Sequence, residues 1–147
     1  MRVEESKYNN LYEKKIVHHL GNFYFFKDYV ISEINEGIHF NYENGKEIID
    51  MAYEHYGEGI KVAYISNRVN SYSLDPRDWI TFYKERHKLE AFAIVAYNKI
   101  GIMNAVLEKL FSQTRIGRFD NLDEAVNWVM TIHKEKETMA NQKNPSE

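Results

Sequence analysis

The stretch Ala91-Phe92-Ala93-Ile94-Val95-Ala96-Tyr97 decides the fold class, because it contains only apolar and aromatic residues. A strand with one face in water alternates apolar and polar residues, whereas a strand covered on both faces is apolar throughout. We therefore predict a central, parallel strand over residues 91–97. A run of this length is also far short of the roughly 18 apolar residues that a membrane span requires, and no longer run occurs in the chain.

The segments that follow this strand have the pattern of a helix, a strand and a second helix. We expect a helix over residues 99–111, a short strand over Arg115–Phe119, and a last helix capped by Asn121 with Glu124 at its third position. Apolar residues recur at helical spacing in both helices. The residues expected to face the core are Met103, Val106, Leu107, Leu110 and Phe111 in the first helix, and Leu122, Ala125, Val126, Val129 and Ile132 in the second.

The segments that precede the strand repeat the alternation. Ile60–Ile65 is almost entirely apolar and predicts another strand buried on both faces. A helix is expected before it over Gly45–Tyr56, with Asn44 as its N-cap and Gly57 as its C-terminal cap. A further helix is expected to begin at Asp75-Pro76, since aspartate caps helices and proline suits their first position.

The N-terminal part of the chain reads as antiparallel strands. Residues 14–34 are rich in aromatic and β-branched residues, with a bulge or bend expected at Gly21-Asn22 and a tight hairpin at Lys27-Asp28. Together these elements predict a single α/β domain with a mixed sheet of four to five strands and about four helices. The sheet would open with an antiparallel hairpin and have a parallel core joined by right-handed crossovers.

One domain accounts for the length of 147 residues. We assign it to residues 11–133, and we expect residues 1–10 to be a flexible N-terminus and the charged residues 134–147 to be a disordered polar tail. The chain has no cysteine, which excludes disulfides, thiolate zinc sites and cysteine nucleophiles. The apolar runs and the start of the chain give neither a membrane span nor a signal peptide, so we expect a cytoplasmic protein.

Charge argues against nucleic acid as a partner. The formal net charge is −3, with 19 basic and 22 acidic residues. A nucleic-acid-binding domain usually carries a basic excess or a basic stripe. The only basic doublet, Lys14-Lys15, lies at the start of an expected strand, where we interpret it as a solvated edge.

The order of elements resembles the STAS-type, sporulation anti-sigma-factor-antagonist-like (SpoIIAA-like) domains. The resemblance extends from about Lys14 to His133 and depends on the hairpin Phe23–Ile34, on the strand Val62-Ala63-Tyr64-Ile65 with its polar loop, and on Ile94-Val95-Ala96. Its most specific part is the ending Arg118-Phe119-Asp120, followed by Glu124-Ala125-Val126-Asn127-Trp128-Val129. The resemblance implies a sheet of four or five strands with helices mainly on one face.

Members of this family are mostly regulators that bind partner proteins, and some bind nucleotides or lipids. In the antagonists, a kinase phosphorylates a serine in the loop after the central strand. The corresponding loop here holds Ser71 and Ser73 as phosphorylation candidates, but it lacks the Asp-Ser-Ser-Gly sequence of those antagonists. The resemblance implies no catalytic residue.

The loop Asn67–Asp78 is the predicted site for a ligand or a partner. Ligands of open α/β sheets bind beyond the carboxyl ends of parallel strands. The loop would also lead into a helix start, whose free N–H groups favour an anion that Arg68 could bind with two donors. His39 is included as a candidate because the nearby turn requires Gly37 but gives no structural reason for a histidine. The candidate residues are Asn67, Arg68, Asn70, Ser71, Tyr72, Ser73, Asp75 and His39.

Neither a metal, a cofactor nor a catalytic group is indicated elsewhere in the sequence. The histidines lack HxH and HExxH spacing, and His18 and His19 would point to opposite faces of a strand. The chain has no Gly-x-Ser-x-Gly turn. Gly57-Glu58-Gly59 lacks the remaining glycine of a dinucleotide fingerprint and precedes a strand instead of following one.

Three functions therefore stay open. The first is a non-catalytic regulatory or protein-interaction module, with another protein or a second copy of the chain as partner. The second is a binder of a small apolar or amphipathic, lipid-like ligand, suggested by the aromatic residues Phe25, Tyr29, Tyr72, Trp79, Phe82 and Tyr83. The third is an enzyme of unrecognised type that uses the 67–78 loop. A pocket beside this loop would favour the second or third function, and a flat surface would favour the first.

Overall fold

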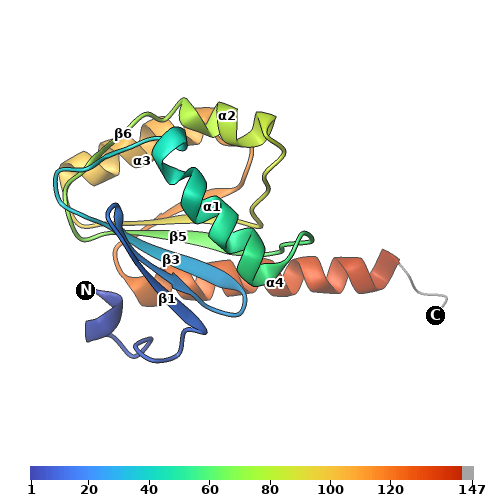
Figure 1. Ribbon diagram of the computed structural model, residues 1–147. Coiled ribbons are helices and arrows are strands. Elements are labelled where there is room, and N and C mark those ends of the chain that lie inside the picture. The colour runs from blue at the N-terminus through green and yellow to red at the C-terminus, as the bar shows by residue number, and fades with distance from the viewer. Residues whose placement is uncertain (144–147) are drawn as a thin grey trace.

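The computed structural model describes the backbone of residues 1–143 and contains a mixed six-stranded sheet (Figure 1). Its strands lie in the order β1-β2-β3-β5-β7-β8. The first three pair antiparallel, and β3, β5, β7 and β8 run parallel to one another. The strands span Lys14–His18 (β1), Gly21–Phe25 (β2), Tyr29–Ile34 (β3), Ala63–Arg68 (β5), Phe92–Ala96 (β7) and Ile116–Phe119 (β8).

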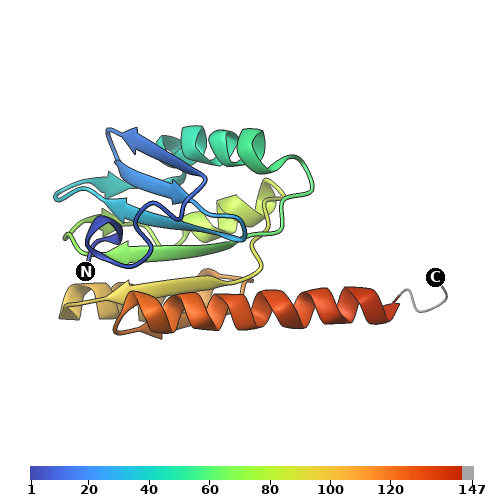
Figure 2. The same ribbon diagram turned by 90° about the horizontal axis from the view of Figure 1, so that it is seen from below.

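Helices cover both faces of this sheet (Figures 1 and 2). The helices span Tyr42–Tyr56 (α1), Asp78–Lys84 (α2), Lys99–Phe111 (α3) and Leu122–Lys143 (α4). Helices α1, α2 and α3 pack on one face, and α4 packs on the other together with the 3-10 helix Val3–Glu5. Two short strands, His39–Phe40 (β4) and Ser73–Leu74 (β6), form a separate parallel pair. None of the helices described is long and apolar enough to cross a bilayer.

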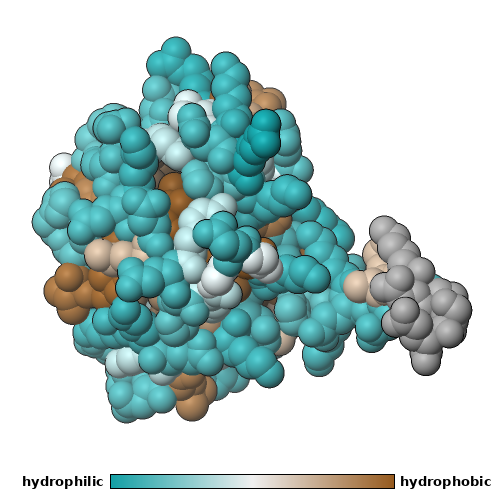
Figure 3. All heavy atoms as spheres, turned by 45° about the vertical axis from the view of Figure 1, so that its right-hand side comes forward, coloured by the Kyte–Doolittle hydropathy of each residue, from teal (hydrophilic) through white to brown (hydrophobic). Residues whose placement is uncertain are grey.

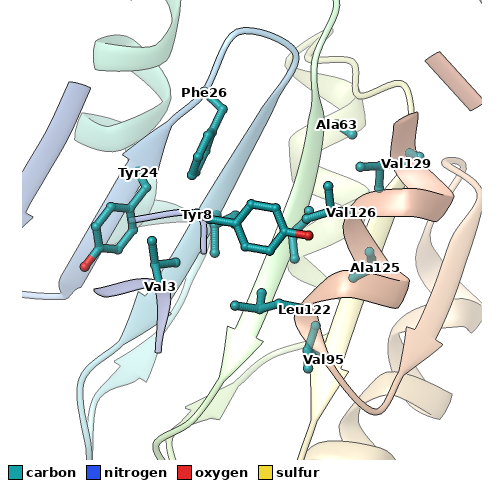
Figure 4. Close-up of a cluster of buried hydrophobic side chains, with 14 of the residues drawn as sticks. Val3, Tyr8, Tyr24, Phe26, Ala63, Val95, Leu122, Ala125, Val126 and Val129 are labelled. Atoms are coloured by element: carbon teal, nitrogen blue, oxygen red, sulfur yellow. The ribbon is translucent and has the colours of Figure 1, made fainter. Parts of the chain in front are cut away.

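The core on the α4 face joins the two ends of the chain (Figure 4). Val3 and Tyr8 from the N-terminal segment and Leu122, Ala125 and Val129 from α4 belong to one buried cluster with residues of β2, β3, β5 and β7. Tyr8 also donates a hydrogen bond from its hydroxyl to Asp123 Oδ1 over 2.7 Å. This sheet face is therefore covered by elements from opposite ends of the sequence.

The mixed α/β fold is confirmed, but the sheet has six strands and not the four to five we expected. The difference arises at Gly21, where we expected a bulge within one β-rich stretch. The chain instead turns at His19-Leu20 and starts β2 at Gly21. A Cβ at Gly21, which has a φ of +152°, would lie 2.2 Å from the carbonyl oxygen of Glu33, so only glycine allows β2 to approach β3 here.

The parallel strand predicted over residues 91–97 is confirmed as β7, which is buried throughout and lies between β5 and β8. Helix α3 has the predicted bounds, and Asn121 accepts a hydrogen bond from the backbone N–H of Glu124 as expected for the cap of α4. Helix α1 begins earlier than predicted, because Asn41 and not Asn44 is its N-cap. Asn44 occupies the third position of the helix, where its backbone N–H donates to Asn41 Oδ1 and its own Oδ1 accepts from Asn41 N.

The orientation predicted for α3 is wrong. Met103, Val106, Leu107 and Leu110 are exposed by 65, 60, 45 and 74%, whereas the buried residues of the helix are Gly101, Ala105 and Glu108. Small residues let the helix lie close to the sheet, since a Cβ at Gly101 would already be 3.2 Å from Ala96 Cβ. The buried Glu108 has a charged partner on β5, described below. Because α3 lies close to the sheet through its small residues and places Glu108 toward its charged partner, the apolar side of the helix faces solvent.

The chain termini also differ from expectation. Residues 1–10, for which we expected a flexible N-terminus, include a 3-10 helix and bury Val3 completely. The tail predicted to be disordered from residue 134 is helical as far as Lys143, because α4 continues well beyond the core. The remaining part of that predicted tail, residues 144–147, lies outside the described residues.

Candidate functional site

A cavity of about 180 Å³ lies between α1, α2 and the sheet. The sheet contributes Phe23, Phe25, Tyr64 and Phe92 to its walls, and α1 and α2 contribute Ile48, Ala52, Trp79 and Phe82. Most of its lining residues are therefore apolar or aromatic. Figure 3 shows one face of the molecule, on which hydrophobic side chains gather in separate patches and hollows of a mainly hydrophilic surface.

The sheet side of the cavity is built by residues at alternate positions of neighbouring strands. Tyr64 on β5 and Phe92 on β7 are cross-strand partners, and their rings stack with centroids 5.3 Å apart. Trp79 of α2 packs on Phe92 with centroids 4.7 Å apart. The hydroxyl of Tyr64 is hydrogen-bonded to Ser32 Oγ over 2.7 Å, and burial raises its pKa. Tyr64 is therefore neutral and fixed in position.

A buried ion pair contributes to the lining of the cavity. Arg68 Nη2 on β5 lies 2.7 Å from Glu108 Oε2 on α3, and the two side chains are only 5% and 3% exposed. Arg68 Nε donates to Ser66 Oγ over 3.0 Å, and Trp79 Nε1 donates to Glu108 Oε1 over 3.2 Å. Tyr72 packs its ring against the guanidinium, 5.8 Å from ring centroid to Cζ. Side chains from three segments, namely Ser66 on β5, Tyr72 in the loop after it and Trp79 on α2, thus hold the pair in place.

Arg68 nevertheless keeps an unused donor. Its Nη1 is buried and has no hydrogen-bond partner among residues 1–143. Glu108 Oε2 is close to Nη2 but off the direction of its N–H bonds, so this contact is an ion pair and not an aligned hydrogen bond. Buried polar groups are nearly always paired, and an unpaired one is destabilising by about 1–3 kcal/mol. Nη1 and Oε2 are both buried, so this unmet hydrogen-bonding capacity belongs to the ion pair itself and not to the surface of the cavity.

A histidine between two tyrosines lines another part of the cavity. His87 Nε2 is 2.9 Å from the hydroxyl of Tyr42, and His87 Nδ1 is 2.8 Å from the hydroxyl of Tyr53. Burial lowers the pKa of His87 and favours the neutral ring. Because a neutral imidazole has one donor and one acceptor nitrogen, one tyrosine donates and the other accepts. The bridge ties α1 to the segment that follows α2.

Three of the candidate residues from the sequence line this cavity. They are Arg68, Tyr72 and Asp75, and the cavity thus borders the predicted 67–78 loop. The loop itself is shorter than we expected, because strand β5 does not stop at Ile65 but continues to Arg68. Arg68 therefore points from a strand to Glu108 and not to the start of α2. That helix begins at Asp78 and not at Asp75-Pro76.

Asn67 lies on the opposite face of the sheet. Its Nδ2 donates to Glu33 Oε2 and to the Met1 carbonyl, over 2.8 and 2.9 Å, and its Oδ1 accepts from the Tyr97 hydroxyl over 2.7 Å. Glu33 Oε2 also accepts from Val3 N over 2.8 Å, and burial raises the pKa of Glu33. Asn67 thus anchors the N-terminal segment instead of facing the cavity.

The other candidate residues lie outside the cavity, on the surface. Asn70 donates to the Ile34 carbonyl, and Ser71 N donates to Glu36 Oε2. Pairing of β4 with β6 brings His39 Nδ1 within 2.7 Å of Ser73 Oγ. Among residues 1–143, however, no carboxylate bonds to the His39 ring, so the pair lacks the third group that orients a catalytic base. Phosphorylation of Ser71 and Ser73 stays a prediction.

Sequence reasoning missed Glu108, Ser66 and His87. The available signal was that Glu108 directly follows a run of uncharged residues, 100–107, on the same helix. Of the six aromatic residues that suggested a ligand, the cavity is lined by Phe25, Tyr72, Trp79 and Phe82 but not by Tyr29 or Tyr83. Among the residues that the structure describes, no group of three or more His, Asp or Glu could hold a metal ion.

The fold of most of the chain is similar to that of a solved structure. It is the crystal structure of an uncharacterized protein from the DUF3478 family with a SpoIIAA-like fold, from Shewanella loihica PV-4. The match covers 73% of this chain and 90% of that chain, with a TM-score of 0.52 and 9% sequence identity, so the likeness concerns the fold alone. Searches of protein-family models and of curated proteins gave no match. The chain thus has a SpoIIAA-like fold.

Proposed function

We propose that this domain binds a small, largely apolar ligand in the cavity between α1, α2 and the sheet. The observation that carries the proposal is a cavity with mostly apolar and aromatic walls, which a few polar side chains such as Arg68, His87 and Glu108 also line. Ligand sites in proteins combine these features: mostly apolar walls and a few polar groups that fix orientation. The 67–78 loop borders a pocket and not a flat surface, which favours ligand binding over the alternatives.

The size of the cavity limits the ligand. An engineered apolar cavity of about 150 Å³ binds benzene, and the cavity here measures about 180 Å³. A ligand of one aromatic ring with a short substituent, or a short aliphatic chain, is therefore the expected occupant. A full-length lipid chain would require α1 and α2 to move apart.

Filling the cavity tests this proposal. Ala52 lines it from α1, whereas Glu54, two residues further on the same helix, is exposed and does not line it. We expect Ala52→Phe to abolish the binding of ethylbenzene, phenol and other monocyclic probes in ligand-observed NMR. The matched variant Glu54→Phe should bind them like the parent protein. Probes that bind both variants equally, or that do not bind the parent protein, would refute a ligand site here.

A second candidate function, a protein-interaction module, is favoured by the exposed side of α3. Ile100, Met103, Val106 and Leu110 are each at least 59% exposed on this one helix. Large exposed apolar patches mark interaction sites. The charged residues exposed on α3 are Lys99 and Lys109, and its acidic residue, Glu108, is buried. The charges therefore favour a partner protein with an acidic, apolar docking segment over a second, equally basic copy of α3.

Photo-crosslinking from position 106 tests this second function. We expect one partner with an acidic segment to crosslink from Val106, and nothing specific to crosslink from Lys134, which is exposed on α4. Leu110→Glu should weaken the crosslink more than Leu110→Lys, since only the first repels an acidic partner. Crosslinking to a second copy, or to lipid, or equal effects of the two variants would overturn the proposal.

A further inference from the structure

The N-terminal residues 1–5, here called the strap, lie on a buried carboxyl group of the sheet. Glu33 of β3 is only 3% exposed, and its Oε2 accepts from Val3 N and from Asn67 Nδ2, each over 2.8 Å. Asn67 Nδ2 also donates to the Met1 carbonyl over 2.9 Å. The strap is therefore bound to two buried polar side chains through its main chain.

No charged partner balances Glu33 among the side chains described, which are those of residues 1–142. Both of its hydrogen-bond donors, Val3 N and Asn67 Nδ2, are uncharged. Burial raises the pKa of Glu33, and the two hydrogen bonds, which favour the charged form, offset only part of that effect. An ionised Glu33 is therefore unfavourable while the strap covers it.

The neighbouring charged groups do not reverse this effect of burial. From the strap itself, Arg2 lowers the pKa of the carboxyl and Glu4 raises it, each by less than burial does. On β1, Lys15 is paired with Glu4. Tyr24 on β2 and Tyr97 after β7 stay neutral, because burial raises their pKa values, that of Tyr97 to about 12.

Docking of the strap and protonation of Glu33 therefore favour each other. A protonated carboxyl keeps an acceptor oxygen for Val3 N, whereas an ionised one is more stable in water than in this site. When the strap leaves, Glu33 is hydrated and its pKa returns toward the ordinary value of 4.5. Since the raised pKa belongs to the docked state, docking is strongest below pH 4.5 and weakens as pH rises through the raised value.

We propose that residues 1–5 form a proton-linked strap, which loosens from the sheet as pH rises because the ionised Glu33 beneath it requires water. Val3 belongs to the same buried cluster as Tyr24 and Leu122, so release of the strap uncovers an apolar surface between β2 and α4 (Figure 4). The strap lies on the opposite sheet face from the cavity, so it acts whether or not the cavity binds a ligand.

The next contact along the chain stays in place over this pH range. Tyr8 donates to Asp123 Oδ1 over 2.7 Å, and this hydrogen bond lowers the pKa of Asp123. The acceptor thus stays ionised wherever Glu33 titrates. Tyr8 remains attached to α4 while residues 1–5 move, and it marks the end of the strap.

Hydrogen exchange of the Val3 N–H, measured by NMR on the full chain, tests the strap. Its protection factor, which corrects for the intrinsic pH dependence of exchange, reports how firmly the strap is docked. We expect this factor to fall as pH rises from 4 to 8, by at most about tenfold per pH unit for a single proton, and to level off above the raised pKa of Glu33.

Glu33→Gln separates the charge from the contact, because the amide oxygen can accept from Val3 N but does not titrate. In this variant the protection of Val3 should stay the same from pH 4 to pH 8. The matched variant Glu54→Gln, at an exposed position of α1, should behave like the parent protein. An equal fall in Glu33→Gln, or a constant or rising protection in the parent protein, would overturn the proposal.

Should Glu33→Gln not fold, the titration of Glu33 itself gives the reciprocal test. In the parent protein the carbon-13 shift of its carboxyl should titrate above 4.5, over the range in which Val3 loses protection. Val3→Gln places a polar amide in an apolar position and releases the strap, so the midpoint should return toward 4.5. A midpoint at 4.5 in the parent protein, or one that stays equally high in Val3→Gln, would show that strap and proton are not linked.

Discussion

Breaking the Arg68–Glu108 pair should reveal how strongly the domain depends on a charge balance inside its core. We consider Glu108→Gln, which keeps an acceptor for Trp79 Nε1 but leaves the guanidinium without a counter-charge. Removing one partner of a buried ion pair is destabilising by about 3–5 kcal/mol, because the remaining charge is buried alone. This is a large part of the 5–15 kcal/mol that typically separates the folded and unfolded states of a domain.

The expected magnitude follows from the size of the chain. For a domain of about 150 residues, 1 kcal/mol shifts Tm by roughly 2–4 °C, so the variant should melt about 10 °C below the parent protein. Arg68→Met should lower stability by a similar amount. The double variant Arg68→Met/Glu108→Met should stay within about 1 kcal/mol of the parent, because replacing a whole buried pair by apolar groups is close to neutral.

Urea unfolding of the parent protein, Arg68→Met, Glu108→Met and the double variant at pH 7, followed by circular dichroism, gives the coupling between the two side chains. An exposed pair serves as control: Arg115 Nη1 and Glu135 Oε2 are 3.9 Å apart, with side chains 64% and 59% exposed. Glu135→Gln should change the free energy of unfolding by less than about 1 kcal/mol. The description of a buried, coupled pair would be refuted if the two core substitutions changed the free energy of unfolding additively. It would also be refuted if either single substitution lowered this free energy no more than Glu135→Gln does.

Two further predictions concern the α4 face. Burial lowers the pKa of His133, but its hydrogen bond to Glu90 and the surrounding carboxylates outweigh burial and raise the pKa above 6.5 overall. A raised pKa in the folded state stabilises the fold fully below the unfolded pKa, and the gain is lost as pH rises through the folded value. His133→Gln should therefore lower the free energy of unfolding at pH 5.5 more than at pH 9, and an equal loss at both would contradict this. Val3→Ala should be destabilising by about 2 kcal/mol because Val3 is fully buried; no change in urea unfolding would mean that the N-terminal segment does not pack in solution.

The sequence predicted those elements whose evidence is local. The apolar run around Ile94 predicted a central parallel strand, and the spacing of residues 99–111 predicted the bounds of α3. The cap at Asn121 and the glycine at position 57 were likewise visible from neighbouring residues alone. Where the local signal was ambiguous, as at Gly21, the prediction merged two strands that a turn separates.

The candidate site was predicted only in part, because its residues are defined by contacts over long stretches of sequence. The loop after β5 was the right place to look, and Arg68 and Tyr72 do line the cavity. Their role was wrong: Arg68 was expected to bind an anion at a helix start, whereas it pairs with Glu108 on α3. No spacing rule connects these two positions.

By itself, the sequence determined the α/β class, the order of most elements and an apolar centre for the sheet, since each follows from hydrophobic periodicity within a short window. Only the tertiary structure decided which side of α3 faces inward. An apolar stripe predicts burial when nothing competes with it, but in α3 the small residues Gly101 and Ala105 and the ionic partner Glu108 face the sheet instead. Close approach to Ala96 and neutralisation of Arg68 depend on residues remote in sequence, and their geometry exists only once the sheet has formed.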